Sequence, residues 1–409
     1  MTSQTKIRYG ASLIILTLLV SITAFAQDTT IRFRLPQRIR VSERSNLSQR
    51  DNGRYRGLLT REASGYLTRS PEAIEGLEGA TGYEGEFFLY EQLRRDMQQI
   101  ARPVDQSTEA RVVLSERGLF LYSPPFPSYH AIPVLPDGPV RLGQSWNLWG
   151  QIRLQPDKDV AALNLPVYIQ YTYEGIETWN GAPSHRIEAR FSTRYPLPER
   201  ENEEEGPVVE YQGEIVTVQG SHQLTIMIPT SGAQQMFIRD EINEQYRFAD
   251  GTSSTYTGHT LLFLNALSLE SRSRIAESIE DDLEEDDVTI AQTDTGVRLT
   301  IQALRFQPNQ AVLLPEERQR LDRVAAALAR VENARFLIVG HTADIGRPES
   351  QQRLSVERAE TIAAELVERG SDPNRLDLQG RGGTQPVATN ATDEGRQQNR
   401  RVEIYVLEQ

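Results

Sequence analysis

The periodicity of the apolar residues changes once along this chain, and that change limits the folds it can adopt. In the first two thirds of the 409 residues, apolar and polar side chains alternate. Ile187, Ala189 and Phe191 are one example, and such alternation is the pattern of a strand with one buried face. From Val297 onward, short strand-like runs alternate with helical stripes. The sequence therefore predicts a mainly β N-terminal region followed by an α+β domain with helices on one face of a mixed sheet.

Turn residues separate the alternating runs of the N-terminal region. Asn180-Gly181 and Asp250-Gly251 lie between such runs, as expected for two-residue hairpin turns that need positive φ. The segment Glu84–Ile100 has the only plausible helical pattern in this region. We expect one or two antiparallel sandwiches or half-barrels. The prolines between residues 124 and 140 leave open a division of the region into two subdomains.

The first 26 residues have the pattern of a secretory signal peptide. Lys6 and Arg8 precede an apolar run over residues 11–20, and Ala24-Phe25-Ala26 supplies the small residues that signal peptidase prefers. The apolar run is short for a bilayer span, and no later segment reaches about 18 apolar residues. The sequence therefore predicts a periplasmic mature chain without a transmembrane helix, with association with the outer membrane as an option.

Charge and cysteine content exclude several classes of function. The chain carries 57 acidic and 44 basic residues, a net charge of −13. A nucleic-acid-binding protein needs a basic face that neutralises phosphates, so nucleic acid is not an expected partner. Because the sequence contains no cysteine, disulfides, thiolate metal sites and a lipidated N-terminal cysteine are excluded.

An acidic run from Glu277 to Asp287, with eight carboxylates, marks the expected domain boundary. It lacks the tight glycine turn of a calcium loop, so a solvated linker kept open by self-repulsion is the favoured interpretation. The predicted organisation is a signal peptide at 1–26, a β-rich region at 27–275, an acidic linker at 276–287 and an α+β domain at 288–409.

The N-terminal region shows no recognisable catalytic or metal site. It has no nucleophile elbow, Walker loop or dinucleotide-binding motif, and its histidines lack zinc-ligand spacing. We therefore expect no enzyme activity, no cofactor and no metal. A hydrolase is the remaining alternative, and its signature would be two buried carboxylates in a cleft. The tryptophans are interpreted as core or hairpin aromatics rather than a sugar or lipid groove. The residues considered are His130, His185, His222, His259, Trp146, Trp149 and Trp179.

The C-terminal domain is predicted in more detail because its periodic segments are long and bounded by turn signals. Proline and acidic residues open the first helix, and glycine ends the second. The expected elements are strand Val297–Phe306, a helix from Pro315 to about Val331, strand Phe336–Val339, helix Glu349–Glu368, strand Leu376–Gln379, helix Glu394–Asn399 and strand Val402–Leu407.

Two separated motifs in this domain carry a family resemblance. GHTADIGRPESQQRLSVERA (340–359) and NRRVEIYV (399–406), with the lead-in LRFQPNQAVLLPEE (304–317), resemble the OmpA-like domain, the peptidoglycan-binding module of OmpA, Pal and MotB proteins. The GHTA variant is similar to spirochaete members of this family. The resemblance covers about 110 residues and says nothing about residues 27–285.

The resemblance implies a site for a peptidoglycan stem peptide, which presents carboxylates and an amine. A fixed guanidinium suits the carboxylate because its planar fork binds in a bidentate manner, and Arg358 follows Leu354 by one helical turn. Arg401 is assigned a structural role, since consecutive strand residues face opposite ways. The residues that the resemblance assigns to binding are Arg358, Thr342, Asp344, Asn309, Asn399 and Arg400.

Three positions depart from the family pattern. Ala343 and Gln307 stand where the family usually has acids, and Gln351 replaces an asparagine. The amine-binding half of the site therefore lacks two carboxylates. Three outcomes are open: Asp344 substitutes through a local shift, the ligand carries a different diamino residue, or binding is lost.

The leading hypothesis is a periplasmic, non-enzymatic protein that binds peptidoglycan and presents its β-rich region to an envelope protein. The alternative is a degenerate OmpA-like domain that has lost peptidoglycan binding and acts as a protein-interaction scaffold. The position of Asp344 distinguishes the two, because a side chain pointing to solvent favours the scaffold.

Overall fold

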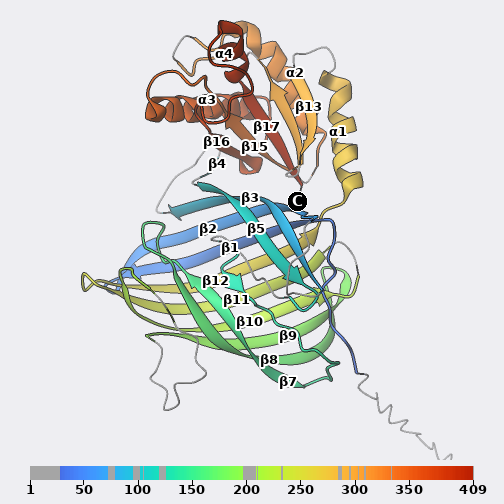
Figure 1. Cartoon of the computed structure of the whole chain (residues 1–409), viewed down its shortest axis with the longest axis vertical. Coiled ribbons are helices and arrows are strands. Elements are labelled where there is room, and N and C mark those ends of the chain that lie inside the picture. The colour runs from blue at the N-terminus through green and yellow to red at the C-terminus, as the bar shows by residue number, and fades with distance from the viewer. Residues whose placement is uncertain are drawn as a thin grey trace, which may run out of the picture.

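The computed structural model describes residues 28–71, 79–94, 102–104, 106–118, 126–196, 209, 211–231, 234–283, 288–293, 296–302, 304–307, 310–332 and 334–408. A curved β-sheet forms the N-terminal part, and a smaller α+β domain lies against its outer face (Figure 1). The expected signal peptide lies outside the described residues. None of the helices in the described ranges is long and apolar enough to cross a membrane.

Eleven strands of the described N-terminal region form one sheet in the order β5-β3-β2-β1-β12-β11-β10-β9-β8-β7-β6. Every neighbouring pair is antiparallel. The prediction of a mainly β region is confirmed, and of the two predicted forms the structure has a single half-barrel sheet, not a sandwich. Because strands from both sides of residues 124–140 belong to this sheet, the region is not divided there. The strands are β1 Arg38–Asp51, β2 Arg54–Arg69, β3 Ala80–Arg94, β5 Gln106–Ser115, β6 Tyr129–His130, β7 Ser145–Leu154, β8 Leu163–Trp179, β9 Ala182–Tyr195, β10 Ile215–Pro229, β11 Gln234–Phe248 and β12 Ser253–Ala266.

The prediction of a helix over Glu84–Ile100 is wrong. The described part of this segment belongs to β3, which pairs with β2 and β5. Tyr83 and Phe87 point into the core of the half-barrel, while Phe88 and Tyr90 are buried on the other face, in contact with the C-terminal domain. A strand covered on both faces loses its alternation, and its apolar residues then imitate a helical stripe.

Two irregular segments pack against the inward-facing side chains of the sheet and complete its core. Ile31 and Phe33 come from the chain before β1, and Tyr129, Ile132 and Leu135 come from the proline-rich connection. All five are at most 3% exposed. The interior of the half-barrel is therefore filled mainly by the protein's own chain.

The C-terminal domain has a six-stranded mixed sheet in its described residues, in the order β13-β14-β17-β15-β16-β4. The pairs β15–β16 and β16–β4 are parallel, and the others are antiparallel. The α+β prediction is confirmed. The elements are β4 Arg102–Pro103, α1 Leu269–Leu283, β13 Val288–Thr293, β14 Gly296–Ile301, a 3-10 turn Pro315–Glu317, α2 Arg318–Ala329, β15 Ala334–Gly340, α3 Pro348–Glu368, a 3-10 turn Pro373–Arg375, β16 Leu376–Gly380, α4 Asp393–Asn399 and β17 Val402–Glu408.

Helix α1 occupies most of the segment that we expected to be an acidic linker. Ala276, Ile279 and Leu283 are buried in the core of the C-terminal domain, with spacings of three and four residues. Glu277 and Glu280 are exposed. Glu277 and Glu280 thus lie on the solvent face of an amphipathic helix, and residues 284–287 lie outside the described ranges.

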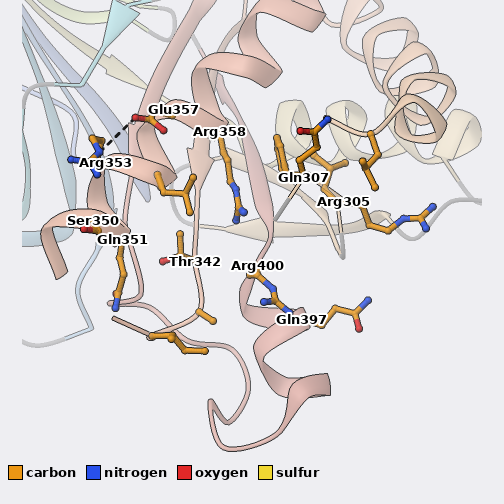
Figure 2. Close-up of a pocket in the computed structure, with 16 residues that line it drawn as sticks. Arg305, Gln307, Thr342, Ser350, Gln351, Arg353, Glu357, Arg358, Gln397 and Arg400 are labelled. Atoms are coloured by element: carbon orange, nitrogen blue, oxygen red, sulfur yellow. Dashed lines mark ion pairs between the residues drawn. The ribbon is translucent and has the colours of Figure 1, made fainter. Parts of the chain in front are cut away.

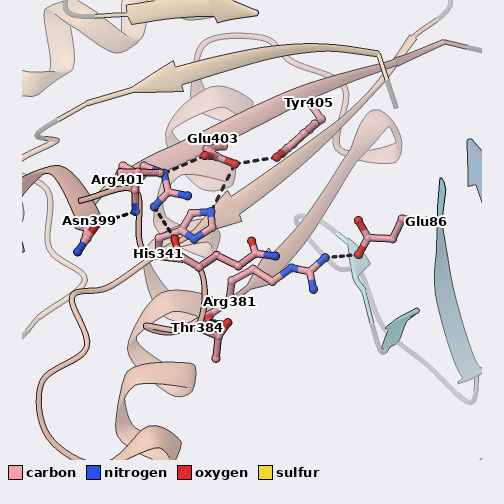
Figure 3. Close-up of polar contacts among 10 residues, drawn as sticks. Glu86, His341, Arg381, Thr384, Asn399, Arg401, Glu403 and Tyr405 are labelled. Atoms are coloured by element: carbon pink, nitrogen blue, oxygen red, sulfur yellow. Dashed lines mark hydrogen bonds and ion pairs between the residues drawn. The ribbon is translucent and has the colours of Figure 1, made fainter. Parts of the chain in front are cut away.

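The face of the C-terminal sheet opposite its helices packs on the outer face of β2 and β3 (Figure 1). Tyr66, Phe88 and Tyr90 contact Leu337, Val339 and Leu407. Strand β4, from the N-terminal region, extends the C-terminal sheet, and Arg381 forms an ion pair with Glu86 (Figure 3). The two parts therefore share an apolar interface, a strand pairing and an ion pair.

Candidate functional site

A pocket of about 760 Å³ opens beside the end of β15 in the C-terminal domain (Figure 2). Its wall comes from the loop before the 3-10 turn, the chain after β15, helix α3 and the C-terminal end of α4. The lining residues are Leu304, Arg305, Phe306, Gln307, Leu314, Thr342, Ala343, Ile345, Ser350, Gln351, Arg353, Leu354, Glu357, Arg358, Gln397 and Arg400.

Helix α3 lies unusually close to the sheet, and two glycines make this approach possible. A Cβ atom added to Gly340 would lie 2.1 Å from the Ser355 carbonyl oxygen, and one added to Gly380 would lie 2.4 Å from Ser355 Oγ. Ser355 Oγ accepts a hydrogen bond from the backbone N–H of Gly382 at 2.9 Å. These contacts hold α3 against the strand ends and so set the position of Arg358.

Arg358 is the charged group at the centre of the pocket. The residue is 7% exposed, and its guanidinium carbon lies 4.9 Å from the centroid of the Phe306 ring. Its Nε has no hydrogen-bond partner, and no described acid forms an ion pair with it. Figure 2 shows its guanidinium pointing toward that of Arg400. Burial lowers the pKa of Arg358, and the charge of Arg400 lowers it further, to about 10, so Arg358 remains charged at neutral pH.

Thr342 supplies a second buried polar group to the pocket wall. Its backbone N–H donates to the Gly382 carbonyl at 2.8 Å, which anchors the chain after β15. The residue is 6% exposed, and its hydroxyl has no hydrogen-bond partner within the described protein. A buried hydroxyl without a partner costs stability, so this group is available for a ligand.

A buried polar network supports the pocket from behind (Figure 3). The Glu403 carboxylate accepts from Arg401 Nε at 2.8 Å and from the Tyr405 hydroxyl at 2.7 Å, and lies 3.5 Å from His341 Nε2. Burial acts to raise the pKa of Glu403, but His341, Arg401 and Tyr405 together lower it below the usual range. Arg401, at 5% exposure, lies directly before β17 and faces this network.

Asn399 and Arg400 are neighbours in sequence, but only one of them lines the pocket. Arg400 is exposed and lines the pocket. Asn399 is fully buried behind the wall, where its Oδ1 accepts from the backbone N–H groups of Val387 and Ala388 at 2.8 and 2.9 Å. Its Nδ2 donates to the Ala388 carbonyl and to Asn390 Oδ1. The structure thus places Asn399 as a support for the loop after β16, not as a pocket-lining group.

We expect Asn399→Ala to destabilise the protein by about 2–3 kcal/mol, because two backbone N–H groups lose their acceptor. The measurement is the free energy of unfolding from denaturant titration. Arg400→Ala is the matched neighbour and should change this free energy by no more than about 0.5 kcal/mol. Equal losses in the two variants would contradict the structural assignment of Asn399.

The acidic half of the expected site is absent from the described pocket wall. Asp344 is exposed and does not line the pocket, and its Oδ1 accepts from Gln351 Nε2 at 3.1 Å. Ala343 and Gln307, which stand where the resemblance leads one to expect acids, both line the pocket. Asn309 lies outside the described residues.

The structure therefore brings Arg358, Thr342 and Arg400 together and leaves Asp344 off the wall. Sequence analysis gave no role to Phe306, whose ring lies beneath the guanidinium of Arg358. The available signal was that Phe306 directly precedes Gln307, a position at which the family resemblance leads one to expect an acid.

Comparison with known families identifies this part of the chain. The pattern of the OmpA family matches residues 305–400, which include the pocket residues from Arg305 to Arg400. Residues 305–400 form an OmpA family domain. Its relatives include OmpA and peptidoglycan-binding proteins.

Two curated relatives illustrate the similarity. The chain is 41% identical over 102 residues to "Outer membrane protein A" of Bordetella avium, covering 25% of this chain and 53% of that protein. It is 40% identical over 103 residues to "Peptidoglycan-binding protein ArfA" of Mycobacterium bovis, and this match covers 25% of this chain and 32% of that protein. The chain thus spans about half or less of the length of these relatives.

Among solved structures, the cell wall anchor of the type VI secretion system from Pseudomonas aeruginosa is 34% identical, with a TM-score of 0.30, and the match covers 34% of this chain and 99% of that one.

A cluster of buried charges lies in the core of the half-barrel. His222 Nδ1 is 2.6 Å from Asp240 Oδ2, and its Nε2 is 3.1 Å from Glu244 Oε1. Tyr129 and Tyr246 donate hydroxyl hydrogen bonds to the same two carboxylates. Burial acts to lower the pKa of His222, but the two acids raise it to about 10.

This cluster contains the two buried carboxylates that the hydrolase alternative requires. The adjoining cavity measures only about 60 Å³, which is room for a few water molecules. A sugar or peptide does not fit there. Among the described residues, no group of three histidine, aspartate or glutamate side chains is arranged to hold a metal ion.

Proposed function

We propose that this chain is an exported, non-enzymatic envelope protein that binds peptidoglycan non-covalently through the pocket beside α3. The observation that carries the proposal is Arg358, a residue that is only 7% exposed and has no acidic partner among the described residues, on the wall of a 760 Å³ cavity. An uncompensated buried cation is costly unless a ligand supplies the opposite charge. The printed function of the relative ArfA, peptidoglycan binding, supports the same ligand class.

Arg358 is suited to grip a carboxylate of the stem peptide. Its stem and Nε are held by burial, and its guanidinium stacks on Phe306, so little side-chain freedom is lost on binding. The unpartnered hydroxyl of Thr342 can donate to the same ligand, and Arg400 can close over it from the exposed side. Binding is reversible because it rests on hydrogen bonds and charge alone.

The proposed location is the periplasm, on the side of the outer membrane. The expected signal peptide at 1–26 and the outer-membrane name of the Bordetella relative support this proposal. The half-barrel packs on the helix-free face of the OmpA family sheet through Tyr66, Phe88 and Tyr90. It would thus be held at a defined orientation to the cell wall, where we propose that it meets an envelope protein partner.

Co-sedimentation of the purified protein with sacculi tests this function. We expect the protein to pellet with sacculi and to be released by soluble stem peptides that carry free carboxylates. Serum albumin, as a control for non-specific trapping in the pellet, should stay in the supernatant. Recovery of the protein in the supernatant with albumin would overturn the proposal.

A protein-interaction scaffold without cell wall binding is the second candidate function. It is favoured by the exposed position of Asp344, which leaves the described pocket wall without the acid that the family usually supplies. In the same experiment, the scaffold predicts no pelleting with sacculi at any protein concentration.

A further inference from the structure

The charges on the pocket wall are unbalanced. Arg305 forms ion pairs with Glu316 and Glu317 outside the pocket, and Arg353 lies 3.7 Å from Glu357, the acid among the lining residues. Arg305 and Arg353 therefore each lie near an acidic side chain.

Arg358 and Arg400 have no acidic partner among the described residues. Figure 2 shows their guanidinium groups facing the same space beside Thr342. The charge of Arg400 acts on Arg358 strongly enough to lower its pKa, which places the two cations within electrostatic reach of each other. Two nearby cations in a partly dry pocket require anionic charge from the ligand.

The described pocket wall offers an ammonium group one acid, Glu357, which already lies 3.7 Å from Arg353. Ala343 is 7% exposed on the wall and carries no polar side chain, and Gln307 offers a neutral amide. Asp344 does not line the pocket; its Oδ1 accepts from Gln351 Nε2 at 3.1 Å, and its backbone N–H donates to Asn390 Oδ1. A protonated amine placed in this pocket would meet two guanidinium groups and no free carboxylate among the described residues.

We propose that this pocket selects a carboxylate whose neighbouring amine carries no charge, and that it disfavours a free diamino acid. The inference rests on the proposed function and narrows its ligand to stem peptides in which the amine near the bound carboxylate is absent or acylated. Acylation removes the positive charge and keeps the carboxylate, so such a ligand satisfies Arg358 and Arg400 without repulsion.

Calorimetric titration of the full chain with three small probes tests this selectivity. Pimelate carries two carboxylates and no amine, meso-diaminopimelate carries the same carboxylates with two ammonium groups, and its diacetyl derivative has both amines neutralised. We expect pimelate and the diacetyl derivative to bind at least about tenfold more tightly than meso-diaminopimelate. Equal or tighter binding of meso-diaminopimelate would overturn the inference, and so would an absence of binding by all three probes.

Two variants restore an acid to the wall. Ala343→Asp and Gln307→Glu should each shift the preference toward meso-diaminopimelate by about tenfold, and Gln307 is exposed, so its variant is expected to fold. Asp344→Ala is the matched control, because this acid lies off the pocket, and the preference should not change. An unchanged preference in both acidic variants would overturn the inference.

The sacculus experiment separates this inference from the proposed function. Binding to sacculi together with a preference for meso-diaminopimelate would overturn the selectivity alone. Tight binding of pimelate without any binding to sacculi would overturn the proposed function and leave the selectivity standing.

Discussion

Replacing Arg358 by alanine is expected to abolish co-sedimentation with sacculi while the thermal unfolding temperature stays nearly unchanged. The guanidinium is the buried cation of the pocket, and it forms no ion pair with a described acid that would be lost with it. A bidentate bond between a guanidinium and a carboxylate contains two charge-assisted hydrogen bonds, each worth about 1.5–3 kcal/mol. Their loss corresponds to a weakening of binding by about a hundredfold or more.

Arg353→Ala is the matched control for this experiment. Arg353 lies on the same helix and lines the same pocket, but it is exposed and lies 3.7 Å from Glu357. Exposed ion pairs within a helix contribute little, so this variant should pellet like the parent protein. Equal retention of the Arg358→Ala variant and the parent would show that Arg358 does not hold the ligand.

Replacing His222 by alanine is expected to destabilise the protein by about 3–5 kcal/mol. His222 lies between Asp240 and Glu244 at 2.6 and 3.1 Å, and it stacks on Phe191 at 4.4 Å between ring centroids. Removal of the imidazole leaves two buried carboxylates without their shared cation and opens a cavity beside the ring of Phe191. Denaturant titration measures the change in the free energy of unfolding.

His259→Ala is the matched control, because His259 is only half-buried on β12. We expect a change within about 0.5 kcal/mol. A loss of stability in the His222 variant no larger than in the His259 variant would contradict the role of the buried cluster.

The same residue predicts how stability depends on pH. The pKa of His222 is raised from 6.5 to about 10, so the folded state holds its proton where the unfolded chain has released it. The stabilisation is complete below about pH 6.5 and is lost as the pH rises toward about 10. Burial lowers the pKa values of His130, His185 and His341, so these residues act in the opposite direction. As the pH falls below 6.5, the unfolded chain takes up protons before the folded state does, and the folded state loses stability. A decline in the unfolding temperature between neutral and alkaline pH should therefore be present in the parent and weaker in the His222→Ala variant.

Most elements of the C-terminal domain could be predicted from local pattern, although the expected strand Val297–Phe306 ends at Ile301 and strand β13 was not expected. The expected helix Glu349–Glu368 corresponds to α3 at Pro348–Glu368, and the expected strand Val402–Leu407 corresponds to β17 at Val402–Glu408. Proline at the start of α3 and Gly370 after its end marked its limits, because these residues act on the backbone within one turn. The placement of Arg358 on the pocket side of α3 followed from the same periodicity.

Other features depended on contacts between residues far apart in the chain. Helix α1 was interpreted as a linker because its acids dominate its composition, although Ile279 and Leu283 are buried by the C-terminal core. Strand β3 resembled a helix because the C-terminal domain covers Phe88 and Tyr90. Alternation shows which face of a strand is apolar, but not whether a second domain covers the other face.

The pocket likewise combines features that local sequence pattern predicts with features that depend on long-range contacts. Sequence pattern was sufficient to recognise an OmpA-like domain and to name Arg358, because residue types and their spacing along one helix carry that information. Only the folded chain decided that Asn399 supports a loop from behind the wall and that Asp344 stays off the pocket wall, where it accepts a hydrogen bond from Gln351. The direction of a side chain at the end of a strand is set by hydrogen bonds to distant loops, and these bonds exist only after the strands and helices have packed together.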